Sequence, residues 1–280
     1  MHAPDRCDLL VRGDHVLPVT PGFPVIADGA VAVRDGRIVA VGPRADVESR
    51  WTADDAISGG IVLPGLVNTH GHAAMTLYRG LGDDLPLHDW LTGFVWPAEK
   101  RFTNPDNVAL GTELAVAEML ASGTTTFADM YFFEQQVGEV CARAGIRVLL
   151  GQAVIAFQTP DAPSAEASIA RGKHLLDAWR GHPLVRVSMA LHAVYTVPPA
   201  FLRLGAERSA EWGVPLQIHC SETRKEVEDC LREHGVTPPR LLADTGVLRE
   251  GTILAHGVHL TDDDVNRVCA ALAHAQRPDA

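Results

Sequence analysis

The chain has 280 residues, of which 46% are hydrophobic, and its 35 acidic and 24 basic side chains give a formal net charge of −11. This length accommodates one large α/β domain and a small accessory one, and the acidic balance argues against nucleic acid or an anionic membrane as the main partner. No apolar run reaches the roughly 18 residues of a membrane helix. No apolar signal core follows the start, and the five cysteines show no CxxC spacing. We therefore expect a cytoplasmic protein with reduced thiols.

The first sixty residues predict a small β-sandwich module. Short β-prone runs occur at Leu9–Val11 and His15–Val19. Residues 31–42 alternate around Asp35-Gly36, a dipeptide that fits a two-residue hairpin turn. Such a module normally needs more strands to bury both faces, so residues 1–60 are predicted to form a partial β-sandwich that precedes a second domain at residues 61–280.

From about Gly60 onward, a strand pattern followed by a helix pattern repeats six times. The expected strands are Ile61–Val67, Thr124–Met130, Arg147–Ala153, Arg186–Leu191, Pro215–His219 and Thr252–Ala255. Nearly all-apolar strands are typical of a parallel sheet covered on both faces. A doubly wound sheet is the alternative, but no glycine-rich phosphate loop follows the first strand. We expect an α/β fold, a (β/α)8 TIM-type barrel of which about six β/α units are present.

Histidines stand at the C-terminal ends of four of these six strands. His70 and His72 have the i, i+2 spacing that puts both imidazoles on one face of an extended chain. His219 supplies a third imidazole, and such a set suits a borderline-soft divalent metal such as zinc. His192 and His256 end two further strands, at the edge where β/α barrels build active sites. One such histidine alone is consistent with a structural role, but the repetition favours a metal site.

Glu222 follows His219 by three residues. A carboxylate at this place can move protons between a metal-activated water and a substrate. The alternative is that Glu222 only begins the next helix.

The lysines indicate how many metals to expect. The chain has three, Lys100, Lys173 and Lys225, which are predicted in a loop or in helices. None is therefore placed to become the carboxylated lysine that bridges two metals at a strand end. We expect one divalent metal, zinc first and Fe²⁺ as the alternative.

Several segments resemble the amidohydrolase superfamily, in particular its mononuclear aminohydrolases. They are PGLVNTHGH (64–72), GTTTFADM (123–130), LQIHCSE (216–222) and AHGVHL (255–260). The segments MTLYRG (75–80), LHDWL (87–91) and WPAE (96–99) resemble the 5-methylthioadenosine/S-adenosylhomocysteine deaminases, and triazine chlorohydrolases and guanine deaminase share part of the pattern. The resemblance extends over nearly the whole chain.

This resemblance implies roles for individual residues. The family's metal-ligating histidines correspond to His70, His72 and His219. His256 matches a histidine that hydrogen-bonds the metal-bound water, and Glu222 matches the acid/base residue that protonates a purine ring nitrogen. Glu99 and His192 match substrate-contacting residues, Glu99 near the ribose hydroxyls, and Trp90 is expected in the pocket wall. Without the resemblance, the pattern places Glu99 in an exposed loop and Trp90 in the core.

The activity implied by the resemblance is hydrolytic deamination of an adenine nucleoside, in which a metal-bound hydroxide attacks and ammonia leaves. Hydrolysis of a chloro- or amino-substituted triazine and deamination of guanine are the alternatives. The loop Ile155–Ala162 is expected to shape the pocket that discriminates among them. The expected partner is a small purine nucleoside or a related heterocycle, with no nucleic acid and no membrane, and a homo-oligomer is compatible with the resemblance.

The resemblance also predicts two more β/α units after His256, with a His-Asn-Pro loop and a Gly-Thr-Asp segment whose aspartate is the last metal ligand. Neither motif occurs in these 280 residues. An open arc of strands leaves unpaired edges and apolar surface in contact with water. We therefore expect this polypeptide to be unstable or weakly active, and an inactive truncated fragment is a further alternative.

Overall fold

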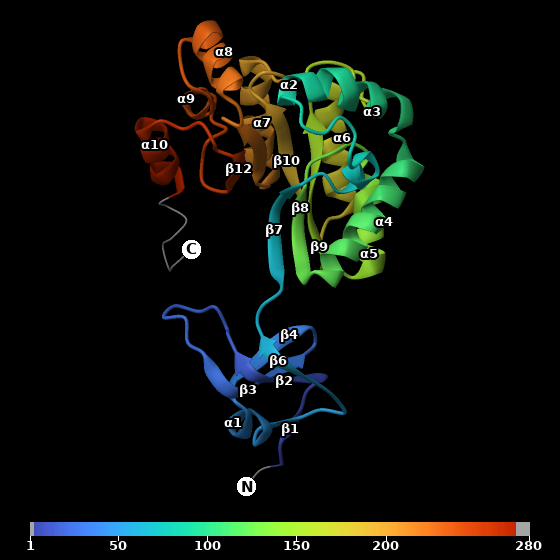
Figure 1. Ribbon diagram of the computed structural model, residues 1–280, viewed down its shortest axis with the longest axis vertical. Coiled ribbons are helices and arrows are strands. Elements are labelled where there is room, and N and C mark those ends of the chain that lie inside the picture. Colours follow the sequence, from blue (N-terminus) through green and yellow to red (C-terminus); the bar gives the residue numbers. More distant parts are fainter. Residues whose placement is uncertain (1–2, 273–280) are drawn as a thin grey trace. The chain divides into compact units, whose positions relative to one another are not determined.

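The structure, a computed structural model, describes the backbone of residues 3–272 and the side chains of residues 3–271 (Figure 1). The chain divides into two compact units, Met1–Leu66 and Val67–Ala280. The first unit contains strands β1 (Asp5–Arg6), β2 (Leu9–Val16), β3 (Ile26–Arg34), β4 (Arg37–Pro43), β5 (Trp51–Thr52) and β6 (Asp55–Val62), and helix α1 (Arg44–Glu48).

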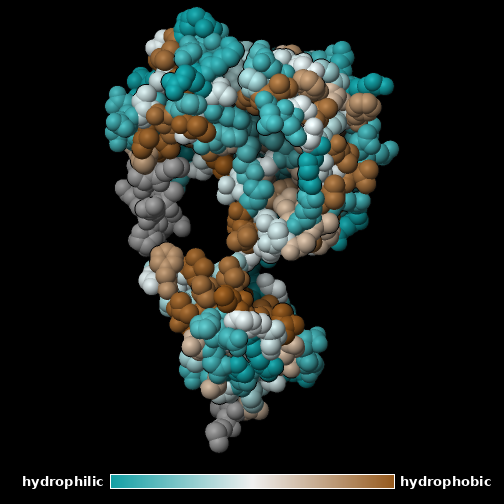
Figure 2. All heavy atoms as spheres, viewed as in Figure 1, coloured by the Kyte–Doolittle hydropathy of each residue, from teal (hydrophilic) through white to brown (hydrophobic). Residues whose placement is uncertain are grey.

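A four-stranded sheet in the order β4-β3-β2-β6 forms the N-terminal unit, beside the two-stranded ladder of β1 and β5. The predicted hairpin is confirmed, because Arg34 pairs with Arg37 across Asp35 and Gly36, whose φ angles are 53° and 69°. A small core forms around Leu10, Ala32 and Val47, whereas other apolar side chains stay exposed on this unit (Figure 2). The partial sandwich over residues 1–60 stays a prediction.

The second unit carries the β/α repeat. Its strands are β7 (Leu66–Gly71), β8 (Thr124–Asp129), β9 (Arg147–Val154), β10 (Val185–Ala193), β11 (Leu216–Cys220) and β12 (Thr252–His256). Its main helices are α4 (Pro105–Ala121), α5 (Glu134–Ala144), α6 (Ala165–Ala178), α7 (Pro199–Trp212), α8 (Arg224–His234), α9 (Pro238–Asp244) and α10 (Asp262–Leu272). Between β7 and α4 lies a helical segment of η1 (Ala73–Tyr78), α2 (Leu87–Trp90), η2 (Leu91–Val95) and α3 (Trp96–Phe102).

These strands form one six-stranded sheet in sequence order, β7 to β12, and the ladders from β8 to β12 are parallel. Helices α5, α6 and α7 pack against β9 and β10, as Figure 1 shows for the coiled ribbons around the sheet. This arrangement is the incomplete six-unit barrel that the sequence predicts. Because the strands run parallel, their C-terminal ends lie at one edge of the sheet.

The first barrel strand was wrongly predicted at Ile61–Val67. The structure ends β6 at Val62, in the N-terminal sheet, and begins β7 at Leu66. Pro64 and Gly65 lie between the two strands, and proline, which has no N–H, does not continue a ladder. The apolar run therefore joins two strands of different sheets.

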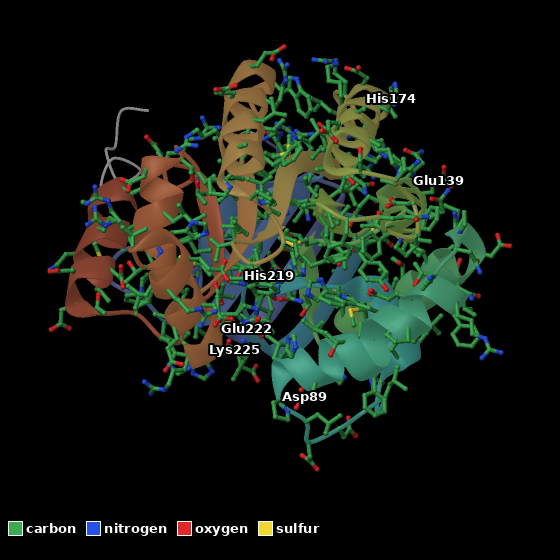
Figure 3. All side chains as sticks on the ribbon, turned by 90° about the horizontal axis from the view of Figure 1, so that it is seen from above. Asp89, Glu139, His174, His219, Glu222 and Lys225 are labelled. Carbon is green, nitrogen blue, oxygen red and sulfur yellow. The ribbon has the colours of Figure 1, made fainter. Side chains whose placement is uncertain are left out.

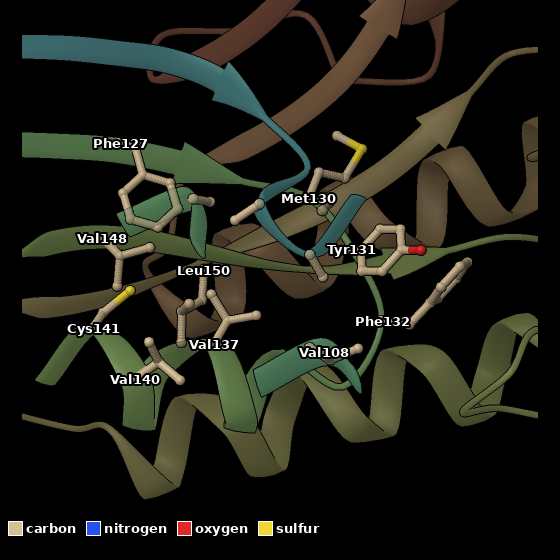
Figure 4. Close-up of a cluster of buried hydrophobic side chains, with 14 of the residues drawn as sticks. Val108, Phe127, Met130, Tyr131, Phe132, Val137, Val140, Cys141, Val148 and Leu150 are labelled. Atoms are coloured by element: carbon tan, nitrogen blue, oxygen red, sulfur yellow. The ribbon is translucent and has the colours of Figure 1, made fainter. Parts of the chain in front are cut away.

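Apolar packing differs across the barrel sheet. Phe127, Leu150 and their neighbours form a buried cluster between the sheet and α4 and α5 (Figure 4), and every residue of β11 is buried. On β7, by contrast, Leu66 and Val67 are 53% and 62% exposed. The middle of the sheet is thus a packed core, and β7 is an exposed edge strand of it.

In the described part of the chain, we find no helix whose length and hydrophobicity suffice to cross a membrane.

Candidate metal centre and active site

Five histidines meet where the barrel strands end. His70 lies near the end of β7 and His72 follows it, while β10, β11 and β12 deliver His192, His219 and His256. The ring of His219 lies 4.8 Å from that of His70, 4.9 Å from that of His192 and 5.3 Å from that of His256, measured between centroids. The parallel sheet therefore brings together side chains that are far apart in the sequence.

Three of these imidazoles form a set that fits a divalent metal. One ring nitrogen from each of His70, His72 and His219 lies within 4.8 Å of the others. The Nδ1 of His72 hydrogen-bonds the Met130 carbonyl at 2.6 Å, and the Nδ1 of His219 hydrogen-bonds the His192 carbonyl at 2.8 Å. If each Nδ1 carries the proton, each Nε2 keeps a lone pair, which is the usual arrangement of metal-binding histidines.

The electrostatic setting keeps these imidazoles neutral. Burial, together with the neighbouring His72 and His256, lowers the pKa of His70 to about 4. Burial also lowers the pKa values of His72 and His219. Neutral imidazole is the form that binds a metal. The donor set therefore suits a divalent metal near neutral pH.

Glu222 lies between β11 and α8, beside His256. Its Oε2 is 3.5 Å from the Nε2 of His256, and Figure 3 shows Glu222 close to His219. Burial raises the pKa of Glu222, which brings a carboxyl group nearer to the range in which it can both give and take a proton. The geometry thus places an acid/base candidate at the histidine cluster.

Glu99 is not in an exposed loop, as its sequence context alone suggests. It lies in α3 and is 6% exposed, and its Oε1 accepts a hydrogen bond of 2.8 Å from the Tyr131 hydroxyl. Burial raises the pKa of Glu99 to about 7. Lys100 also lies in α3 rather than in a loop, and Lys173 and Lys225 lie in α6 and α8. None of the three lysines therefore stands at a strand end, where a lysine that bridges two metals would have to lie.

A cavity of about 290 Å³ joins these groups. It is lined by all five histidines, by Glu99 and Glu222, and by Trp90, whose Nε1 donates to the Leu81 carbonyl at 2.7 Å. The predicted site residues thus lie around one space. A second cavity of about 290 Å³ shares Leu87, Leu91, Trp96 and Tyr195 with the first.

The sequence analysis assigned no role to some residues that lie around the site. Tyr131 follows β8 by two residues, Trp96 lies in the helical segment before α4, and Glu226 lies in the first turn of α8. Glu226 had a sequence signal, because Thr223 and Glu226 have the spacing of a helix capping box. Trp96 begins the WPAE segment of the family resemblance, but the resemblance gave it no role, because its position depends on how a segment without regular periodicity folds over the strand ends. In the predicted loop Ile155–Ala162, Ile155 lines the first cavity and Phe157 the second.

Comparison with known proteins identifies the class. Residues 61–277 match the sequence model of the amidohydrolase family, and residues 29–52 match that of a bacterial imidazolonepropionase-like composite domain. The chain belongs to the amidohydrolase family.

Individual members of this family are similar to the chain over most of its length. The chain is 40% identical over 267 residues to a 5-methylthioadenosine/S-adenosylhomocysteine deaminase of Nitratidesulfovibrio vulgaris, which covers 94% of this chain and 60% of the relative. A zinc-bound adenosine deaminase from Xanthomonas campestris superposes with a TM-score of 0.92 at 39% identity, covering 95% of this chain and 61% of that one. A zinc complex of an atrazine chlorohydrolase from Arthrobacter aurescens (TM-score 0.84, 21% identity, 94% of this chain and 64% of that one) shares the fold.

The chain spans about 60% of the length of the curated relative.

Proposed function

We propose that this site deaminates an adenine nucleoside of the 5-methylthioadenosine or S-adenosylhomocysteine type by hydrolysis. The observation that carries the proposal is the convergence of the His70, His72 and His219 set with the Glu222–His256 pair at the strand ends. The identity of 40% to a deaminase of that name supports the substrate class.

His70, His72 and His219 would hold the metal, for which we propose zinc, because three imidazoles are a common donor set of catalytic zinc. Zinc bound there would supply a Lewis acid that makes water a nucleophile near neutral pH. Iron(II) is the alternative that imidazole ligands also suit. Metal analysis of the purified chain distinguishes the two.

The chain's own residues then move the protons and hold the substrate. Glu222 protonates the purine ring nitrogen beside the carbon that bears the amine, which makes that carbon more electrophilic. His256 hydrogen-bonds the attacking water. The proton that this water loses passes to the amino group, and the C–N bond of the tetrahedral carbon breaks to release ammonia. Glu99 accepts from the ribose hydroxyls, His192 contacts the base, and Trp90 closes the pocket wall.

The second cavity supports the proposal that the substrate carries a substituent on the 5′ carbon of its ribose. Trp96 lines both cavities and lies one helical turn from Glu99, and its ring packs against that of Phe157 with centroids 5.4 Å apart. Aromatic rings at this place suit an apolar group such as a methylthio group.

The test is ammonia release by the zinc-loaded chain, followed together with the absorbance change from adenine to hypoxanthine. We expect turnover of 5′-methylthioadenosine and a rate that is about 1,000-fold lower in a Glu222→Gln variant. Turnover of a triazine or of guanine, with no adenine nucleoside accepted, would transfer the proposal to those substrates. No turnover of any of them would refute the proposed function.

A further inference from the structure

Glu226, in the first turn of α8, is a buried carboxylate that the proposed reaction does not use. It is 4% exposed. Its Oε1 accepts the N–H of Ser221 at 2.9 Å, and its Oε2 accepts the N–H of Glu222 at 2.8 Å. One side chain therefore binds two successive peptide N–H groups, and the second of these belongs to the acid/base candidate itself.

The turn that Glu226 binds has an unfavourable backbone. Ser221 is fully buried and has a φ of 52°, in the left-handed region that residues other than glycine rarely adopt. The Ser221 carbonyl accepts the N–H of His259 at 2.9 Å, and the Cys220 carbonyl accepts that of Gly257 at 2.9 Å. Hydrogen bonds from α8 and from the segment after β12 thus hold this turn on both sides.

The local sequence explains why Glu226 reaches the turn. Thr223 is the N-cap of α8, and its Oγ1 accepts the N–H of Glu226 at 3.1 Å. In an ordinary capping box the glutamate bonds the N–H of the N-cap residue. Here it bonds the two residues before the N-cap instead. The capping residue therefore fixes the segment that carries Glu222, as well as the helix end.

We propose that Glu226 is a positioning residue, which holds the Ser221–Glu222 turn so that the Glu222 carboxylate faces His256 and the substrate. The inference rests on the proposed role of Glu222. Ionised acceptors make strong hydrogen bonds to peptide N–H groups, so the loss of the Glu226 carboxylate would free the turn. A displacement of about 1 Å at a reacting group can reduce the rate about 100-fold.

The test uses Glu226→Gln in the zinc-loaded chain. Glutamine keeps the shape but has one oxygen, so its amide nitrogen faces one of the two N–H groups as a second donor. We expect kcat for 5′-methylthioadenosine to fall about 100-fold, while KM changes less than about threefold, because the turn positions a proton donor rather than a binding group. Amide hydrogen exchange at Ser221 and Glu222 becomes faster.

Asp264→Asn is the matched control. Asp264 is 3% exposed and also caps a helix with its carboxylate, since its Oδ2 accepts the N–H of Thr261 at 3.1 Å. Both variants lose a buried capping carboxylate, so we expect similar losses in thermal stability. Only Glu226→Gln is expected to lower kcat and to expose the Ser221 and Glu222 amides to exchange.

A double variant separates positioning from a general structural effect. In the Glu222→Gln background the acid/base group is already gone, so adding Glu226→Gln is expected to change the residual rate less than about threefold. A full further loss, or an equal loss of kcat in Asp264→Asn, contradicts the proposal. So do Ser221 and Glu222 amides that stay protected in Glu226→Gln. Because exchange needs no turnover, an inactive wild type would refute the proposed function while exchange still decides whether Glu226 holds the turn.

Discussion

Strands β7 and β11 both deliver metal-ligand candidates, yet they are held in different ways. Every residue of β11 is buried, so packing along the whole strand, together with the hydrogen bond between the His219 Nδ1 and the His192 carbonyl, fixes the position of His219. On β7, Val67 is 62% exposed, and hydrogen bonds at the C-terminal end of the strand hold the metal-ligand candidates in place. Gly71 accepts the Met130 N–H at 3.1 Å, and the Asp129 Oδ1 accepts the Ala73 N–H at 2.7 Å. The site is thus supported on β11 by burial of the whole strand and on the exposed β7 by hydrogen bonds at the strand end.

Truncating one apolar side chain on each strand tests this contrast most strongly. Leu216 on β11 is fully buried, and we expect Leu216→Ala to lower the free energy of unfolding by about 2–5 kcal/mol. For the exposed Val67 on β7, Val67→Ala should change it by less than about 0.5 kcal/mol. Urea unfolding of both variants measures the difference. Equal losses would show that β7 is packed as tightly as β11.

The buried carboxyl group of Glu99 is expected to make the free energy of unfolding depend on pH. The pKa of Glu99 is raised to about 7 by burial, so the folded state binds this proton more tightly than the unfolded state does. The contribution of Glu99 to the free energy of unfolding is therefore fully present below about pH 4.5 and is lost as the pH rises through about 7. The loss amounts to about 3 kcal/mol. Glu99→Gln, which keeps an acceptor for Tyr131, is expected to remove this part of the stability difference between pH 5 and pH 8. An unchanged difference in urea unfolding would contradict this assignment.

The polar support of β7 should show in metal affinity. Asp129→Ala removes the acceptor for the Ala73 N–H, next to His72, and we expect zinc affinity to fall about 10-fold, as for other groups that orient metal ligands. Val116→Ala, which removes a buried side chain of α4 away from the site cavity, serves as the control and should lower stability without this loss. Competition with a chelating dye measures both affinities. Equal affinities in the two variants would mean that the β7 end does not depend on Asp129.

The parts of this molecule that the sequence predicts best are those with regular spacing. The i, i+2 pair His70 and His72 and the strand-end His219 are recognisable because strand periodicity and barrel topology fix where they point. The boundary between β6 and β7 was misplaced because one apolar run serves two strands, and only tertiary pairing separates them. The burial of Glu99 was not visible without a family resemblance, because it depends on how the segment before α4 folds over the strand ends.

Zinc content tests the central claim most directly. We predict that the purified chain, saturated with zinc and then freed of unbound metal, retains one zinc ion per molecule by elemental analysis. His219→Ala should retain none, while His174→Ala, which changes an exposed histidine of α6 (Figure 3), should retain one. Equal zinc retention in His219→Ala and the wild type would contradict the metal centre on which the account rests.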